Sequence, residues 1–260
     1  MSVAGGYALR GVTRTDAGRS RLKQVSLHFP CGQMHAVIGP NGGGKSTLLA
    51  VLAGTLRPQG GTVQLHGRDL QDWSRRALAC TRAVLPQAVP AQLPFSVAEV
   101  VALGRHPHPA EAAQVRHQRV QHCLDRVGLL ALISQPYNRL SGGQKARVQM
   151  ARCLAQIMGT PGPGMVLLDE PTASLDPRWQ HDLLRQARAL AEDGHGVVCV
   201  LHDLNLAARY ADTVTLLHQG QVQAAGGPDQ VWSSPALEAS YGLPFQQGEV
   251  GGHRYIMAGD

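Results

Sequence analysis

Residues 39–47 read GPNGGGKST, and this stretch decides the fold of the chain. It follows the apolar run Ala36–Ile38, typical of a buried strand, and leads into residues 46–53, typical of a helix. A glycine-rich loop in this setting lets backbone N–H groups turn inward around a phosphate, and the helix N-terminus adds partial positive charge. The stretch therefore predicts a P-loop, in which Lys45 reaches the terminal phosphates and the Ser46 hydroxyl binds Mg²⁺.

The alternative is a glycine-rich turn that holds a lysine by chance. All fixed positions of the motif are present in the right strand-loop-helix setting, which favours nucleotide binding. The motif alone does not separate kinases, GTPases, motors and transporter ATPases. The residues expected to contact the nucleotide here are Gly39, Pro40, Asn41, Gly42, Gly43, Gly44, Lys45, Ser46 and Thr47.

Composition is that of an ordinary folded protein. The chain has 260 residues, 43% hydrophobic and 16% charged, enough for one α/β domain with an inserted subdomain. Its formal net charge of +6 could indicate a nucleic-acid or membrane partner, but lysine and arginine are scattered and Arg75–Arg76 is only a short pair. No apolar run approaches the roughly 20 residues that span a bilayer, and the N-terminus lacks a signal-peptide pattern, so we expect a cytosolic chain.

The spacing of cysteine and histidine gives no disulfide or metal signature. Five cysteines share no C-x-x-C spacing, which favours reduced thiols. Among twelve histidines only His106 and His108 lie this close, on a proline-rich turn with no third ligand nearby in sequence. We therefore predict neither a disulfide nor a zinc site.

The first part of the chain predicts sheet followed by a helical insertion. Residues 7–29 alternate as short strands, and residues 83–87 form another strand that ends at Gln87. Beyond it, Ser96–Glu99 has the capping-box form that opens a helix, and two further helical patterns follow. We expect residues 88–162 to form an all-helical subdomain.

The chain then returns to sheet, so residues 1–87 and 163–260 together predict an α/β core with N-terminal antiparallel strands. Residues 165–170 and the β-rich run 197–201 read as buried strands, the second of them typical of a parallel strand. A helix is expected to start at Asp176 and to end before Gly194. Residues 213–225 predict a hairpin, and short helices are expected near Gln230 and at 236–241.

Segment 140–144 (LSGGQ) opens the third helix of the insertion. Free backbone N–H groups at this helix start and the Ser141 hydroxyl could hold a phosphate, although a plain turn and helix cap would have the same sequence. The residues proposed to act in this way are Ser141, Gly142, Gly143 and Gln144.

Two acids follow the buried strand 165–168. Asp169 can hold Mg²⁺ through water, and Glu170 can polarise an attacking water. His202 follows another buried strand, where it could hydrogen-bond a γ-phosphate. Taken singly, the acids read as a strand-end turn and His202 as a satisfied buried histidine. Taken in order with the P-loop, they favour nucleotide hydrolysis.

The order of these motifs resembles the nucleotide-binding subunit of ATP-binding-cassette transporters over essentially the whole chain. On this resemblance residues 39–47 match the Walker A motif, Gln87 the Q-loop and residues 140–144 the signature. Residues 166–170 match Walker B, residues 174–176 with Asp176 the D-loop, and His202 the switch histidine. The resemblance implies ATP as substrate, Mg²⁺ bound by Ser46, Gln87 and Asp169, and catalysis by Glu170, His202, Lys45 and Gln87.

The resemblance also implies a head-to-tail homodimer with two ATP molecules at its interface. Each ATP is then held by the P-loop of one copy and the signature of the other. The sequence agrees, because a whole helical subdomain separates the signature from Lys45, and two-fold symmetry brings the two motifs together.

One loop departs from the family pattern. The family usually stacks an aromatic side chain on adenine from a loop that corresponds to residues 13–21, and this loop holds no aromatic residue. Arg14, Arg19 or Arg21 could stack through a guanidinium plane instead, whereas Tyr7 lies too early.

Other stretches of the sequence indicate the subfamily. Residues 101–108 (VALGRHPH) resemble the group that serves vitamin B12, ferric-siderophore and haem importers. Within that group, residues 201–212 and the loop 159–164 are most similar to the haem-import ATPases. This resemblance implies two copies of a membrane permease, a periplasmic haem-binding protein and a place on the cytoplasmic face of the inner membrane. A siderophore or vitamin B12 importer is the alternative.

A rival class is a nucleic-acid or ribosome-associated ATPase with the same core. ATPases of this kind that act in nucleic-acid repair carry long coiled coils or large inserts. Those that act as translation factors on the ribosome carry two cassettes in one chain. This chain has a compact insert, no sustained heptads and one cassette, so we expect no nucleic-acid partner.

Overall fold

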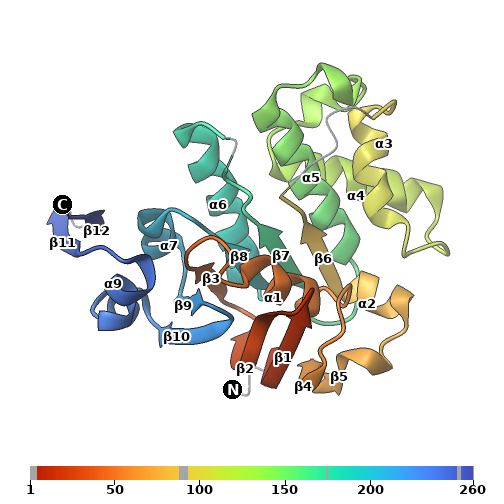
Figure 1. Ribbon diagram of the computed structural model, residues 1–260. Coiled ribbons are helices and arrows are strands. Elements are labelled where there is room, and N and C mark those ends of the chain that lie inside the picture. Colours follow the sequence, from red (N-terminus) through yellow and green to blue (C-terminus); the bar gives the residue numbers. More distant parts are fainter. Residues whose placement is uncertain (1–4, 88–92, 174, 251–252, 260) are drawn as a thin grey trace.

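The computed structural model describes residues 5–87, 93–173, 175–250 and 253–259 (Figure 1). Its centre is a six-stranded sheet in the order β10-β9-β3-β8-β7-β6. All neighbouring strands pair in parallel except β9 and β10, which form the expected hairpin. The strands are β3 (Met34–Ile38), β6 (Arg82–Leu85), β7 (Met165–Asp169), β8 (Gly196–Val200), β9 (Thr213–His218) and β10 (Gln221–Gly226).

The parallel arrangement places the functional candidates at one edge. The P-loop follows β3, Gln87 follows β6, Glu170 follows β7 and His202 follows β8. Because the carboxyl ends of parallel strands meet at the same edge of a sheet, residues far apart in sequence come together there.

One face of this sheet is covered by helix α1 (Lys45–Leu52) and by an antiparallel sheet in the order β2-β1-β4-β5. Leu48 and Leu52 of α1 share a buried cluster with Leu167 of β7 and with residues of the antiparallel sheet, and Tyr7 Oη donates to Leu52 O at 2.7 Å. The strands of this second sheet are β1 (Gly6–Asp16), β2 (Arg19–Pro30), β4 (Gly60–Leu65) and β5 (Arg68–Asp69). The predicted N-terminal antiparallel strands are confirmed.

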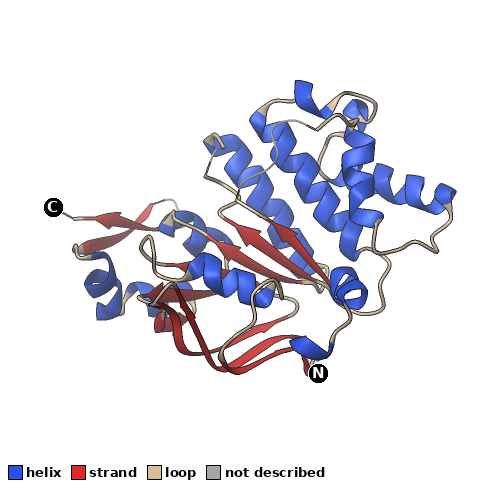
Figure 2. Cartoon of the chain, turned by 45° about the vertical axis from the view of Figure 1, so that its right-hand side comes forward, coloured by secondary structure: helices blue, strands red, loops and turns tan. Residues whose placement is uncertain are grey.

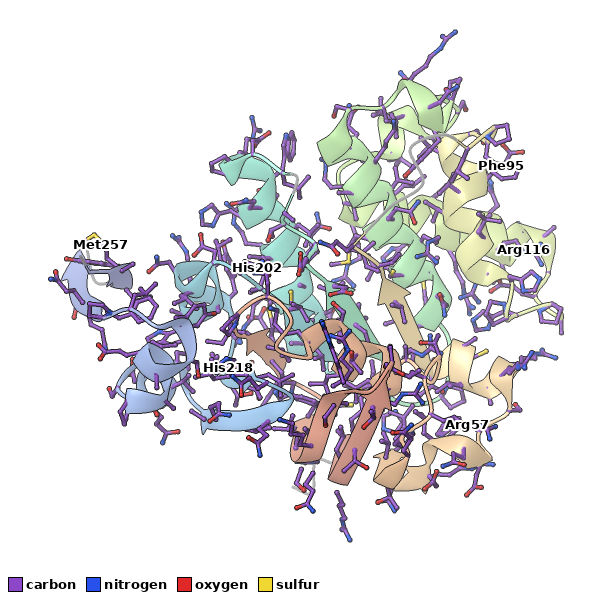
Figure 3. The ribbon with its side chains drawn as sticks, viewed as in Figure 1. Arg57, Phe95, Arg116, His202, His218 and Met257 are labelled. Atoms are coloured by element: carbon purple, nitrogen blue, oxygen red, sulfur yellow. The ribbon has the colours of Figure 1, made fainter. Side chains whose placement is uncertain are left out.

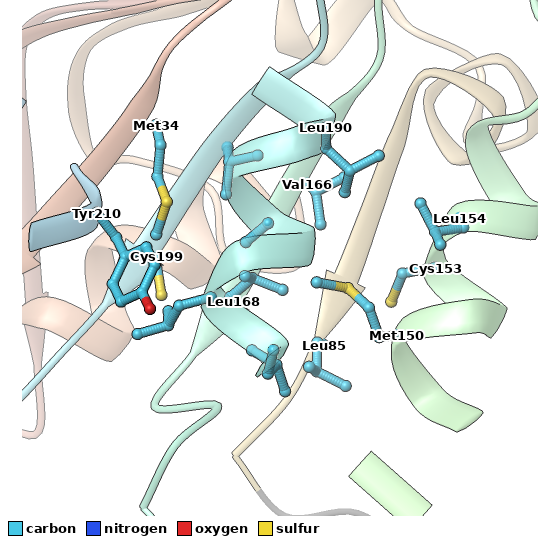
Figure 4. Close-up of a cluster of buried hydrophobic side chains, with 14 of the residues drawn as sticks. Met34, Leu85, Met150, Cys153, Leu154, Val166, Leu168, Leu190, Cys199 and Tyr210 are labelled. Atoms are coloured by element: carbon cyan, nitrogen blue, oxygen red, sulfur yellow. The ribbon is translucent and has the colours of Figure 1, made fainter. Parts of the chain in front are cut away.

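The opposite face carries helices α5 (Gly142–Ile157), α6 (Pro177–Glu192) and α7 (Leu204–Tyr210). Val166 and Leu168 of β7 point into this larger cluster (Figure 4). Met165 and Leu167 belong to the α1 cluster instead, as the two-residue period of a strand requires. Both faces of β7 are therefore buried, which explains its continuous apolar sequence.

Helices α3 (Val97–Ala102), α4 (Ala113–Arg126) and α5 lie together beside the sheet (Figures 1 and 2). Ser96 and Glu99 form the capping box expected at the start of α3. The five cysteines are free thiols. Within the described ranges, no helix is long and apolar enough to cross a bilayer.

The sequence interpretation did not predict β5, α2 (Arg75–Thr81), α7, or the C-terminal hairpin of β11 (Phe245–Val250) and β12 (His253–Ala258). The hairpin docks on α7, because Asn205 Nδ2 donates to Ile256 O at 3.1 Å and Ile256 N donates to Asn205 Oδ1 at 2.8 Å. The remaining C-terminal helices, α8 (Pro228–Trp232) and α9 (Pro235–Tyr241), lie where short helices were expected.

Candidate functional site

The P-loop is held in an open turn against the end of β9. Gly39 and Gly44 have φ angles of 140° and 107°, which residues other than glycine rarely adopt. A Cβ at residue 39 would also collide with the carbonyl oxygen of Leu217. The loop encloses a cavity of about 170 Å³, lined by Arg21, Asn41, Gly42, Gly43, Gly44, Lys45, Ser46, Thr47 and Glu170.

Lys45 is buried within its own loop. Its Nζ donates to Gly39 O at 2.7 Å and to Pro40 O at 3.0 Å. Burial lowers the pKa of Lys45, while the nearby Glu170 and Asp169 carboxylates act in the opposite direction. Because these partners are neutral carbonyl groups, the Lys45 ammonium can exchange them for a negatively charged phosphate with little rearrangement of the backbone.

Asp169 lies next to Ser46, whose Oγ donates to Asp169 Oδ1 at 3.5 Å. Burial, and then the adjacent Glu170 carboxylate, raise the pKa of Asp169. The α1 helix start and the end of β7 thus present a hydroxyl and a carboxylate to the same space. Both are hard oxygen donors of the kind that Mg²⁺ prefers.

Glu170 joins the ends of three strands. Its Oε2 accepts from Gln87 Nε2 at 2.5 Å, and its Oε1 lies 2.6 Å from His202 Nε2. The Glu170 side chain is only 13% exposed, and its backbone has a φ of 48°, an uncommon left-handed conformation for a residue with a side chain. Such strain occurs at functional sites, where the surrounding structure imposes it. Figure 3 shows His202 near the middle of the molecule, whereas Met257 lies at its outer edge.

The signature candidates do not join this group. Ser141 is the N-cap of α5 and forms a capping box with Gln144, in which Gln144 N donates to Ser141 Oγ at 3.3 Å. Ser141 and Gly142 are exposed. In the described part of the chain, none of residues 140–144 lines the P-loop cavity.

Asp176 caps α6, since its Oδ1 accepts from Trp179 N at 3.2 Å, and Ser174 of the D-loop candidate lies outside the described residues. The sequence interpretation missed the role of Trp179 in this region: its indole ring packs against Gly143. A tryptophan three residues after a helix cap was the available signal.

The three arginines considered for stacking on adenine, Arg14, Arg19 and Arg21, differ in their surroundings. Arg14 forms an ion pair with Asp16 and also donates to Arg57 O at 3.1 Å. Arg21 instead lines the P-loop cavity, and Arg19 is exposed. Of the three arginines, Arg21 is the one that lines the P-loop cavity.

The histidine-rich turn after α3 packs against α5. His108 Nε2 hydrogen-bonds with Gln156 O at 2.8 Å, and burial lowers the pKa of His108. Within the described ranges, no three His, Cys, Asp or Glu side chains are grouped to hold a metal ion.

A parallel sheet with a glycine-rich loop after β3, two acids after β7 and a histidine after β8 defines the class of this protein, a P-loop nucleoside triphosphatase. The sequence profile of the family described as ABC transporter matches residues 22–173. The chain belongs to the ABC transporter family.

Similar proteins agree with this assignment. The Hemin import ATP-binding protein HmuV of Gloeobacter violaceus is 48% identical over 230 residues, 87% of this chain and 84% of that protein. A metal-chelate type ABC transporter in an inward-facing conformation is 25% identical with a TM-score of 0.83, covering 98% of this chain and 97% of that one. A dimeric ATP-binding cassette bound to ADP and phosphate is 28% identical with a TM-score of 0.73, covering 85% and 98%.

Proposed function

We propose that this chain is the ATP-hydrolysing subunit of a haem importer in the inner membrane. The observation that carries the hydrolytic part is the contact of Glu170 with both Gln87 and His202 beside the P-loop. The cargo is supported by 48% identity to a hemin import protein over 87% of this chain. The activity is hydrolysis of ATP to ADP and phosphate, coupled to transport.

Phosphate and metal binding fall to the residues around the cavity. Lys45 leaves the carbonyl groups of Gly39 and Pro40 and neutralises the β- and γ-phosphates. Ser46, Gln87 and Asp169 would hold Mg²⁺, because each has an oxygen atom that can bind it. The bound ion would offset the charge of the phosphate groups.

Hydrolysis needs a water held in line with the γ-phosphate. Glu170 orients and activates this water, and His202 stabilises the charge that develops on the phosphate. The Glu170 carboxylate now contacts Gln87 and His202, so these contacts must open before it can reach a water. ATP binding therefore rearranges the three residues together.

The signature segment acts on a second copy of the chain. Its serine and the free N–H groups at the start of α5 lie away from the P-loop cavity of the same chain, but they suit a phosphate presented by a partner. Two copies arranged head to tail complete two sites, with ATP between them. Hydrolysis then removes the γ-phosphate contact and releases the dimer.

The permease partner, of which two copies are expected, docks on a groove of about 770 Å³ between α2, α3 and the histidine-rich turn. Leu103 there is 48% exposed and offers an apolar contact to a permease helix. In this arrangement the chain lies at the cytoplasmic face of the membrane. Haem itself, delivered by a periplasmic binding protein, need not contact this chain.

The test is ATP turnover of this chain assembled with its permease in liposomes. Haem-loaded binding protein should stimulate turnover, with haem accumulating on the side that carries this subunit. Stimulation by a siderophore or cobalamin complex, but not by haem, would keep the mechanism and replace the cargo. Haem binding by this chain without its permease, lost in a His106→Ala, His108→Ala double variant, would show that this chain contacts haem.

A further inference from the structure

Trp179 forms a close contact between the signature segment and the D-loop helix. It is the third residue of α6, half-buried, and its indole ring lies against Gly143, the second residue of α5. A Cβ on residue 143 would lie 2.9 Å from Trp179 Cδ1 and 3.2 Å from its Nε1. Gly143 is therefore the residue that leaves room for the indole ring.

A cation fixes the same ring from α5. Arg147, one helical turn after Gly143, places its Cζ 4.0 Å from the centroid of the Trp179 ring. Its Nη1 also donates to Val127 O, at the end of α4, at 3.2 Å. Arg147 thus ties Trp179 to two helices of the helical insertion.

Farther along the same helices the packing is open. A cavity of about 270 Å³ lies between α4, α5 and α6, lined by Arg126, Leu154, Arg185, Gln186 and Ala189. Beyond it, Arg126 and Asp193 form a partly exposed ion pair at 2.8 Å. Helices α5 and α6 stand side by side in Figures 1 and 2. The Trp179 contact therefore lies at the signature end of α5, where α6 packs against Gly143.

We infer that Trp179 is a positioning residue for ATP hydrolysis, which sets the direction of the first turn of α5 relative to the sheet core. This inference rests on the proposed function, in which that first turn contacts the ATP held by a second copy. Trp179 does not touch the reacting atoms. It acts through Gly143 and Arg147, and a displacement of about 1 Å at such a site can cost on the order of 100-fold in rate.

The experiment compares turnover with nucleotide binding by the monomer. Trp179→Ala should lower kcat for ATP by roughly 10- to 100-fold. It should change the affinity for ADP less than about twofold, since ADP needs only the P-loop of one chain. Trp179→Phe keeps a ring under the guanidinium and should retain most of kcat. Arg185→Ala, at an exposed position on the same helix, is the matched control and should behave as wild type.

A double-mutant cycle separates positioning from general damage. If Trp179 acts through Arg147, then Arg147→Ala should lower kcat to a similar extent, and the double variant should be no worse than either single variant. Wild-type kcat in Trp179→Ala, parallel losses of kcat and ADP affinity, or fully additive losses would each overturn the inference.

Dimerisation separates this inference from the proposed function. Glu170→Gln should form an ATP-dependent dimer, and adding Trp179→Ala should weaken that dimer. Equal dimerisation of the single and double variants would remove Trp179 from its role and keep the proposed function. Absence of an ATP-dependent dimer in Glu170→Gln itself would remove both.

Discussion

At the scale of single residues, the site is a set of charges held by neutral or opposing partners. Lys45 rests on two carbonyl groups, and Glu170 rests between an amide and an imidazole. Two carboxylates in sequence, Asp169 and Glu170, repel each other, which helps to raise the pKa of Asp169. Such a cluster is costly without its ligand and is stabilised when a cation and phosphates bind.

Replacing Glu170 with glutamine should separate binding from hydrolysis. Glutamine keeps the shape of the side chain but cannot take a proton, so turnover should fall by roughly 10²–10⁴-fold. ATP should then hold two copies together, which light scattering with and without ATP would detect. Normal turnover in this variant would take Glu170 out of the role of base.

Replacing Asp169 with asparagine should stabilise the nucleotide-free protein. The pKa of Asp169 is raised above its ordinary value of 3.8, so the folded chain binds this proton more tightly than the unfolded chain. The contribution of Asp169 to stability is therefore present below pH 3.8 and is lost as the pH rises through the raised pKa. At pH 7 the variant should have a higher Tm, by about 2–4 °C for each kcal/mol gained.

The gain in Tm should shrink as the pH falls from 7 toward the ordinary pKa, because wild-type Asp169 then becomes neutral as well. Mg²⁺-dependent turnover should fall in the same variant at least ~100-fold. Calorimetry at several pH values checks the first statement and phosphate release the second. A lower Tm at pH 7 would mean that the Ser46 contact outweighs burial and repulsion.

Arg21 is expected to replace the missing adenine-stacking ring. Removing its guanidinium in Arg21→Ala should weaken ADP binding by roughly 2- to 30-fold, the range expected for one cation–π or stacking contact. Arg14→Ala is the control, since Arg14 is engaged by Asp16 and Arg57. Titration calorimetry gives both affinities, and equal values for Arg21→Ala and wild type would leave the base without a stacking partner.

At the scale of elements, strong periodicity and caps could be read directly from the sequence. The strands around the P-loop are continuous apolar runs, and α3 opens with the predicted capping box. α2 and α7 have seven residues each, too few to show a helical period. The β11–β12 hairpin docks through Asn205, whose partner is 51 residues away. No local pattern can reveal such a contact.

Arg105 holds the turn after α3 against the end of α5, and we expect its replacement to lower stability strongly. Its side chain is fully buried, forms an ion pair with Glu111 at 2.7 Å, and donates to the carbonyl groups of Ala155 and Met158 near the end of α5. Arg105→Ala would leave a buried carboxylate and two carbonyl groups without their main partner. The free energy of unfolding should fall by about 3–5 kcal/mol.

Urea titration followed by circular dichroism measures that loss. Arg119→Ala is the comparison, because Arg119 pairs with the same Glu111 from a partly exposed position and should cost much less. Comparable losses in the two variants would mean that the α5 carbonyl contacts of Arg105 contribute little.

At the scale of the whole molecule, topology explains what the sequence could and could not predict about the site. Gln87, Glu170 and His202 meet because β6, β7 and β8 are parallel neighbours, and the order of motifs already indicated such a sheet. The signature could not be placed by the same reasoning, because its proposed ligand belongs to another copy. One chain alone holds half of each proposed site.

Mixing two inactive variants tests this arrangement. Lys45→Ala disables the P-loop and Gly142→Asp disables the signature, so each homodimer should be inactive. In a mixed dimer, one site takes its P-loop from the Gly142→Asp chain and its signature from the Lys45→Ala chain, and that site is intact. Random pairing gives half mixed dimers with one intact site of two, so co-expression should restore about a quarter of wild-type turnover. A signature that served its own chain would leave every combination inactive, because each chain would still lack one motif.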